Sequence, residues 1–216
     1  MGETTEAEAE VGTVEMGFGD LVLDAGSHVG HFYQTDRERL DLAVPFLAHG
    51  VERGDRCVYL AQPERSREDL LASLSDEGID VGRALDEGRL DVRGGLGDPA
   101  ELERLLTDNA ELVPSAHPML RWGGDMRWSR DEMKDSRALM QWETACNTFR
   151  HRERAVFFCQ YPLSEFSGDV VMDALQTHPV TIVGRSVQRN SLYREPDQFL
   201  ADLEGRAAPS HPEASA

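Results

Sequence analysis

Histidines, tyrosines and carboxylates recur at a few points of this sequence where they could build one polar binding site. The stretch SHVGHFYQTDRERL (residues 27–40) carries His28, His31 and Tyr33 just before a helical pattern. In many nucleotide-binding α/β domains this place, between the first strand and the first helix, holds a loop that binds phosphate. Imidazole and phenol groups there could instead hold a small molecule through hydrogen bonds beside an apolar surface.

The residue content of the chain does not suit a phosphate-binding loop. Such a loop needs glycine-rich backbone amides, a lysine on the phosphate oxygens and a hydroxyl on magnesium. The pattern G-x-x-x-x-G-K-S/T is absent, and Lys134, the one lysine of the chain, has no glycine beside it. The stretch GGLGD (94–98) is an incomplete dinucleotide fingerprint and predicts a turn. The sequence therefore argues against ATP hydrolysis of the P-loop kind.

Other catalytic and metal-binding patterns are also missing from the sequence. There is no G-x-S-x-G nucleophile elbow, and Cys57, Cys146 and Cys159 have no C-x-x-C spacing. His28 and His31 are three residues apart, which on a strand turns them to opposite faces and makes them a poor metal pair. We therefore predict a protein that is not an enzyme, with no cofactor, no metal site and reduced thiols.

Six polar residues are the candidates for a ligand site: His31, Tyr33, Asp125, Glu143, Gln160 and Tyr161. Most of them come where a predicted strand ends, and the strand ends of an open parallel sheet meet at one crevice. We predict that His31, Tyr33, Glu143 and Tyr161 line one cavity for a small, mostly apolar ligand, with Asp125 and Gln160 beside it. For His31, a satisfied and partly buried histidine is an equally good interpretation.

Glu143 is the most informative of these candidates. It lies at the margin of an apolar helical stripe formed by Leu139, Trp142, Cys146 and Phe149. An unpaired buried carboxylate is costly, so a buried Glu143 needs a partner or faces a cavity. We predict that it pairs with a histidine or an arginine; an exposed position on a wide stripe is the alternative.

These side chains need a framework that brings them together, and the sequence predicts one. Apolar runs alternate with helical patterns, and several runs are apolar throughout, as expected for a parallel sheet covered on both faces. The first helix is expected to run from a capping box at Thr35 to Gly54, and the second to begin at a capping box on Ser66. The fold class is therefore α/β, with an open, mostly parallel sheet flanked by helices. The predicted strands are 28–33, 56–61, 89–94, 118–124, 155–161 and 179–184.

The length of 216 residues suits a single domain. Residues 1–24 are acidic and predict a mobile leader, residues 25–205 predict the domain, and residues 206–216 have the composition of a disordered tail. The acidic start lacks the basic residues of a signal peptide, and no apolar run is long enough to cross a membrane. We therefore expect a cytoplasmic protein without membrane contact.

The charge balance is strongly acidic: 22 Lys plus Arg stand against 40 Asp plus Glu, a formal charge of −18. An acidic surface with almost no lysine suits the high-salt cytoplasm of a halophile, because salt screens the repulsion between carboxylates. A high-GC genome, which replaces lysine with arginine, is the alternative explanation. Since no basic stripe exists, we expect no direct binding to nucleic acid.

Several stretches together resemble a known family. The segments HVGHFYQTDRERL, GDMRWS, WETACN and CQYPLSEFSGDVVMDALQTHPVTIVG are similar to the MEDS family, the methanogen/methylotroph DcmR-type sensory domain. The resemblance runs from about His28 to Gly184. It implies a RecA/KaiC-like three-layer sandwich without a phosphate loop, a role in sensing small molecules such as hydrocarbon derivatives, and a link to transcription regulation or histidine-kinase signalling. No helix-turn-helix or kinase motif is evident, so an output through a protein partner is expected.

Three functions follow from these observations. The favoured one is a stand-alone sensory domain that binds a small, mostly apolar ligand at the strand ends and signals through a protein partner. The second is a protein–protein adaptor that docks on a KaiC-like or kinase partner without a ligand of its own. The third is an enzyme that uses His31, Glu143 and Tyr161. A cavity at the strand ends would favour the first, and a flat apolar face the second. Homo-oligomers are compatible with each.

The charge of −18 leads to a prediction about salt. We expect the melting temperature to rise from dilute buffer to molar KCl, because added salt screens the repulsion between surface carboxylates. Thermal unfolding followed by circular dichroism at a series of KCl concentrations measures this. A melting temperature that stays flat or falls would contradict the halophilic interpretation.

Overall fold

One seven-stranded sheet organises the chain. In the computed structural model, which describes residues 12–62, 64–96, 98–113, 115–184 and 186–206, the strand order is β5-β4-β6-β7-β3-β8-β9. All neighbours pair in parallel except β8 and β9. The predicted α/β class with an open, mostly parallel sheet is confirmed. The strands are β3 (His28–Tyr33), β4 (Arg56–Leu60), β5 (Leu90–Arg93), β6 (Leu120–Asp125), β7 (Ala155–Pro162), β8 (Val180–Val183) and β9 (Ser186–Arg189).

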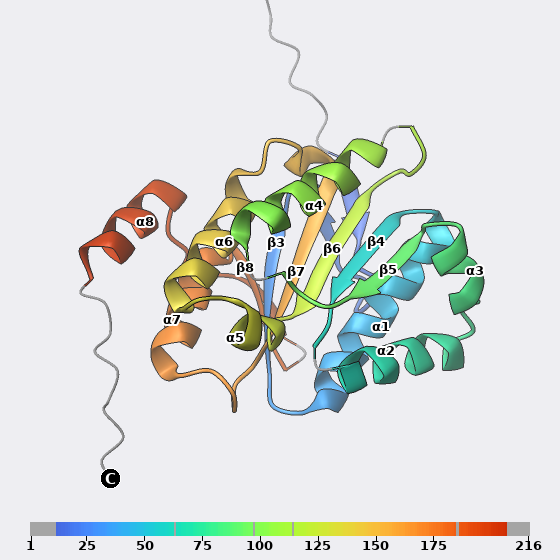
Figure 1. Cartoon of the computed structure of the whole chain (residues 1–216), viewed down its shortest axis with the longest axis horizontal. Coiled ribbons are helices and arrows are strands. Elements are labelled where there is room, and N and C mark those ends of the chain that lie inside the picture. Colours follow the sequence, from blue (N-terminus) through green and yellow to red (C-terminus); the bar gives the residue numbers. More distant parts are fainter. Residues whose placement is uncertain (1–11, 63, 97, 114, 185, 207–216) are drawn as a thin grey trace, which may run out of the picture.

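Helices cover both faces of this sheet and make a three-layer structure (Figure 1). The face that we call the α1 face is covered by α1 (Asp36–Arg53), α2 (Glu64–Asp76) and α3 (Val81–Asp86). The opposite α6 face is covered by α4 (Pro99–Leu112), α6 (Ser136–Thr148) and α7 (Gly168–Thr177), and α8 (Pro196–Gly205) packs on α6 and α7. The short α5 (Trp128–Glu132) follows β6, and a 3-10 turn (Arg152–Arg154) precedes β7.

The central strands are buried on both faces, which is why their sequences are apolar throughout. Every residue of β3, β6 and β7 is buried. Successive side chains of a strand point to opposite faces, so each strand contributes to two separate cores. In β7, Phe157 and Tyr161 belong to the core under α6, whereas Val156 and Phe158 belong to the core under α1. This alternation decides where each polar side chain of the sheet goes.

The first helix begins and ends as its sequence predicts. The Thr35 hydroxyl accepts a hydrogen bond from the Glu38 amide, and the Glu38 carboxylate accepts one from the amide of Gln34. Gly54 follows the helix in the left-handed conformation, with φ of 82°. The prediction for the second helix was wrong at its start: α2 already begins at Glu64, so Ser66 lies inside the helix and its hydroxyl is free to serve another purpose.

The N-terminal part of the described chain is more ordered than the sequence indicates. Strands β1 (Thr13–Glu15) and β2 (Val22–Asp24) form an antiparallel pair, and Met16 is fully buried in the core under α1. The prediction of a mobile leader up to residue 24 was therefore too long; residues 1–11 lie outside the described residues, as does the predicted tail beyond Arg206. Among the described residues, no helix is both long and apolar enough to cross a membrane.

A close approach of α1 to the sheet yields a prediction. A Cβ added at Gly50 would lie 2.3 Å from Cδ of Arg121 and 2.6 Å from Sγ of Cys57. We expect Gly50→Ala to destabilise the fold by about 1–3 kcal/mol, although alanine is the better helix former, because Arg121 is held by Asp55 and cannot move freely. Urea unfolding measures the difference.

Gly82 in α3 is the matched control, since its nearest neighbour to an added Cβ is an Asp80 oxygen at 3.7 Å. Gly82→Ala should be neutral or stabilising by up to about 1 kcal/mol. Equal effects of the two substitutions would contradict the packing argument.

Candidate functional site

Two clusters of buried polar side chains lie on opposite faces of the sheet. His31 and Tyr33 of β3 point to the α1 face, whereas His28 of the same strand points to the α6 face. In β7, Gln160 contacts His31 and Cys159 contacts His28. The period of two in a strand separates the clusters completely.

The first cluster, which we call the strand-end network, is built around Asp125 at the end of β6. One carboxylate oxygen accepts a hydrogen bond from the Tyr33 hydroxyl at 3.0 Å, and the other accepts from the Ser66 hydroxyl at 3.1 Å. Arg127 donates to Asp125 from Nε at 2.8 Å and from Nη2 at 2.5 Å, and Nε of Arg39 lies 3.4 Å away. Both oxygens of this fully buried carboxylate are thus satisfied.

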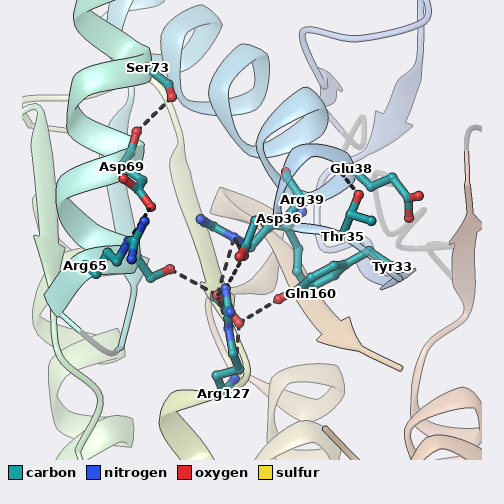
Figure 2. A network of polar contacts seen from close by, with 12 residues as sticks. Tyr33, Thr35, Asp36, Glu38, Arg39, Arg65, Asp69, Ser73, Arg127 and Gln160 are labelled. Atoms are coloured by element: carbon teal, nitrogen blue, oxygen red, sulfur yellow. Dashed lines mark hydrogen bonds and ion pairs between the residues drawn. The ribbon is translucent and has the colours of Figure 1, made fainter. Parts of the chain in front are cut away.

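The same network reaches the start of α1, where a phosphate loop would place its amides. Arg127 also donates to Asp36 at 2.5 Å, and Asp36 pairs with Arg39 (Figure 2). With Glu38 hydrogen-bonded to the amide of Gln34, carboxylates occupy the positive end of this helix. Ion pairs within the chain itself therefore lie at the start of α1.

His31 belongs to a chain of hydrogen bonds that fixes its proton. Oε1 of Gln160 accepts from the Tyr59 hydroxyl at 2.5 Å, so the amide nitrogen of Gln160 faces Nδ1 of His31 at 2.9 Å and the Arg39 carbonyl at 3.0 Å. Nδ1 of His31 is therefore an acceptor, and the ring proton is on Nε2. Burial lowers the pKa of His31 to about 4, so the ring is neutral at pH 7.

The second cluster, which we call the histidine cluster, lies between β3, β7, α6 and the residue after α7. Its members are His28, Glu143, Cys159 and His178, all buried. Oε2 of Glu143 is 3.1 Å from Nε2 of His28 and 3.4 Å from Nε2 of His178, and the Tyr161 hydroxyl donates to Oε1. The prediction that Glu143 pairs with a histidine or an arginine is confirmed for histidine, but the pair does not lie beside the predicted His31 site.

Burial and mutual contact shift the ionisation of this cluster. Burial alone would raise the pKa of Glu143, but His178 and His28 outweigh it and hold that pKa below its usual range. Burial and the neighbouring His178 lower the pKa of His28 to about 4. Burial and the Glu143 charge raise the pKa of the Tyr161 hydroxyl. The carboxylate form of Glu143 is thus the favoured one.

Gly30 makes room for this cluster. A Cβ at this position would lie 2.8 Å from Cγ of His178. The ring of His178 can therefore lie against the backbone of β3, with its centroid 4.0 Å from that of His28.

The six predicted ligand residues do not share one cavity. His31, Tyr33, Asp125 and Gln160 meet on the α1 face, whereas Glu143 and Tyr161 meet on the α6 face. The prediction of one cavity lined by His31 and Glu143 was wrong, because alternate residues of β3 and β7 face opposite ways and α6 covers only one side. All six are fully buried or nearly so.

Several members of both clusters escaped sequence reasoning. Arg39, Ser66 and Arg127 were not expected beside Asp125, His28 was considered only as a poor metal pair with His31, and His178 was not among the candidates. The alternation of side chains along the strands was a usable signal for His28. Once β3 and β7 are paired, His28, Cys159 and Tyr161 fall on the same face of the sheet. The placement of His178 beside them required the tertiary structure.

A surface cavity opens at the ends of β6 and β7. It has a volume of about 290 Å³ and lies among α5, the loop to α6, and the β7–α7 loop. Its apolar lining comes from Met133, Leu139, Phe166 and Val170, and Arg130 and Glu165 form an ion pair at 2.5 Å on its wall. Phe166 packs edge-on against Tyr161, with ring centroids 5.3 Å apart. The Phe166 side chain therefore lies between the cavity and Tyr161, the residue that donates a hydrogen bond to Glu143.

Comparison with known families places this arrangement. The family model described as "MEDS: MEthanogen/methylotroph, DcmR Sensory domain" matches residues 27–179. The chain belongs to the MEDS family. The matched region contains both polar clusters and the whole cavity, so the MEDS domain and the sensory role of its family apply to the part of the chain analysed above.

Similar proteins agree with the MEDS assignment. The transcriptional repressor DcmR of Methylorubrum extorquens (strain DSM 6343 / CIP 106787 / DM4) is 30% identical over 156 residues, which cover 71% of this chain and 58% of the repressor. The chain thus matches little more than half of that relative's length.

Solved structures support the fold. A KaiC-like protein of Pyrococcus horikoshii OT3 has a TM-score of 0.59 at 16% identity and covers 81% of each chain. An uncharacterized protein of P. horikoshii, in complex with an unknown peptide, has a TM-score of 0.57 at 13% identity, over 73% of this chain and 77% of that one. The expected KaiC-like architecture is confirmed.

The buried neutral His31 predicts a pH dependence of stability. Its pKa is about 4 in the folded protein and near 6.5 when exposed, so the unfolded chain binds the extra proton between these values. This residue should therefore cost stability as pH falls from 6.5 to 4, by up to about 3 kcal/mol. His31→Asn keeps an acceptor for Gln160 and should flatten the slope. Urea unfolding at several pH values measures it; equal slopes in the two proteins would contradict the assignment.

Proposed function

We propose that this MEDS domain is a sensory domain that binds a small molecule in the cavity at the ends of β6 and β7 and passes the signal to a protein partner. The observation that carries the proposal is the cavity itself, with its apolar lining and its ion-paired wall. It lies outside the carboxyl ends of parallel strands, where open α/β sheets bind their ligands.

The size and lining of the cavity indicate the class of ligand. A volume of about 290 Å³ is at the low end of ligand pockets and suits a small molecule. Leu139, Phe166 and Val170 offer apolar contact, while Arg130 and Glu165 can each bind one polar group of the ligand. A small, mostly apolar molecule with one polar end fits this combination.

The proposed ligand would act on both polar clusters. Glu165 on the cavity wall pairs with Arg130 at 2.5 Å and lies 3.6 Å from Arg127, which belongs to the strand-end network. On the other side, Phe166 contacts Tyr161 and so reaches Glu143. Moving the β7–α7 loop would thus change contacts on both faces of the sheet, and this is a route by which occupancy could alter the surface that a partner reads.

We further propose that the output is an interaction with a protein rather than with nucleic acid. The chain has 40 acidic and 22 basic residues, and the resulting negative charge repels the phosphates of nucleic acid. The role of DcmR as a transcriptional repressor belongs to a longer protein, of which this chain matches 58%. In this chain, the strand-end loops would instead present the signal to a partner.

Blocking the cavity tests the ligand site. Val170, half-buried on the cavity wall, is replaced by tryptophan, and Met172, exposed on the same helix, is replaced likewise as the control. The probes are short-chain alcohols, ketones, carboxylic acids and alkyl halides, with binding followed by protein-observed NMR and by thermal shift. We expect at least one class to bind the wild type and Met172→Trp, and to lose about tenfold or more in affinity with Val170→Trp.

Native mass spectrometry of protein purified at high salt adds a second readout, because a tightly held ligand would stay bound. The proposal fails if no probe perturbs the cavity residues and no ligand is retained, or if the two tryptophan variants bind equally. A protein that captures a partner without any ligand would favour the adaptor function instead.

A further inference from the structure

The histidine cluster has the composition of a metal site. One ligand atom from each of His28, Glu143, Cys159 and His178 lies within 4.8 Å of all the others, and all four residues are buried. They come from β3, α6, β7 and the residue that follows α7, so only the folded chain brings them together.

The outer hydrogen bonds of both histidines turn the same ring nitrogen inward. Nδ1 of His178 lies 2.6 Å from the Ala174 carbonyl, which can only accept, so this nitrogen carries the proton. Nδ1 of His28 faces Oδ1 of Asn147 at 3.3 Å, and the amide nitrogen of Asn147 is used on the Thr177 carbonyl at 2.7 Å. Both rings therefore turn Nε2 toward the centre of the cluster, where it can bind a metal ion when it carries no proton.

Both imidazoles of the cluster converge on one carboxylate oxygen. Oε2 of Glu143 faces both Nε2 atoms, at 3.1 and 3.4 Å, and Oε1 is already occupied by the Tyr161 hydroxyl. Neither Oε2 of Glu143 nor Nε2 of His178 has a hydrogen-bond partner among the described residues. A proton on Nε2 of one imidazole, or a metal cation between the donor atoms, would remove the repulsion between these lone pairs and the buried carboxylate.

The spacing of the donor atoms suits a metal ion as that cation. A tetrahedral site with ligand bonds of about 2.0–2.3 Å has its ligand atoms about 3.3–3.8 Å apart. The observed separations include 3.1 and 3.4 Å from Oε2 to the two imidazoles and 3.5 Å from Sγ of Cys159 to Nε2 of His28. A small inward movement of the remaining atoms would complete the tetrahedron.

We propose that His28, Glu143, Cys159 and His178 bind one divalent transition-metal ion, with Zn²⁺ the best fit. Two imidazoles and a thiolate select borderline and soft ions over Mg²⁺ and Ca²⁺, which prefer oxygen. One thiolate and one carboxylate neutralise the double charge of the ion in this dry interior. Four protein ligands leave no open position, which is typical of a structural site.

The residues around the four ligands have the arrangement that metal sites use. A metal-bound histidine usually donates its other ring nitrogen to a carbonyl or carboxylate oxygen, and a metal-bound carboxylate is itself hydrogen-bonded. Here the Ala174 carbonyl, Asn147 and Tyr161 provide these contacts. The proposal does not depend on the ligand cavity, because the four donor residues are buried and none is among the residues that line it.

The test measures metal bound to the whole chain. The protein is unfolded in chelator and refolded with an equimolar amount of Co²⁺, which replaces Zn²⁺ and absorbs light. We expect about one cobalt ion per chain, an absorption pattern typical of a tetrahedral site, and a thiolate-to-cobalt charge-transfer band in the near ultraviolet. Metal analysis of the protein as purified should show about one zinc ion per chain.

Cys159→Ser is the test variant and Cys57→Ser the control. Cys57 is also a fully buried thiol, but it lies on the α1 face against the Leu47 carbonyl. Cys159→Ser should lose the charge-transfer band and bind cobalt at least about tenfold more weakly, while Cys57→Ser keeps both. If Cys159→Ser does not fold, X-ray absorption of the wild-type cobalt protein must show one sulfur ligand.

Three results would contradict the proposal of a metal site. Wild type that folds identically without metal and binds no cobalt would overturn the proposal and leave the cluster as a protonated ion pair. The proposal is also wrong if the bound cobalt has no sulfur ligand, or if the two serine variants bind it equally.

Discussion

The burial of one carboxylate, Glu143, constrains more of this fold than any other group. It lies in the middle of α6, fully buried, and three of its polar partners come from other elements. His28 comes from β3, Tyr161 from β7 and His178 from the turn after α7. Leaving any of these contacts unmade would strand a charge in a medium of low dielectric, at a cost of several kcal/mol. The pairing of Glu143 therefore requires α6 and α7 to stay close to β3 and β7, and Gly30 leaves the space that the His178 ring needs.

On the opposite face, the strand-end network places charged side chains at the start of α1. In phosphate-binding relatives of this architecture, a positive helix end and a lysine would face an anion. Here Asp36 and Glu38 supply the anions from within the chain, and Arg39 and Arg127 supply the cations. These side chains form one network centred on Asp125. A cavity that is open to solvent lies beside this network, between α5 and α7.

The sequence predicted the framework well because the relevant signals are local. The six main strands, the cap at Thr35 and the turn at Gly54 each depend on a few adjacent residues. The sites were predicted less well because they depend on which face a strand shows to which helix. His31 was assigned to the site because it lies near a strand end, and Glu143 because it lies at the margin of an apolar stripe. Neither property shows on which side of the sheet the residue lies. The start of the second helix was mispredicted for a related reason. The residues from Ser66 have the sequence of a capping box, but the helix has already begun at Glu64.

The strict alternation along β3 and β7 has a consequence for how this chain can evolve. Gly30 lies opposite Cys159, and His31 opposite Gln160, in a register that assigns neighbouring residues to different faces. Deleting or inserting one residue within either strand would turn every following side chain of that strand to the opposite face. His31, which contacts Gln160, would then face Glu143. Substitutions can be absorbed one at a time, but a change of length here would exchange the two interiors at once. Length variation among descendants of this sequence should therefore be confined to the loops, and β3 and β7 should keep their number of residues even where their identities drift.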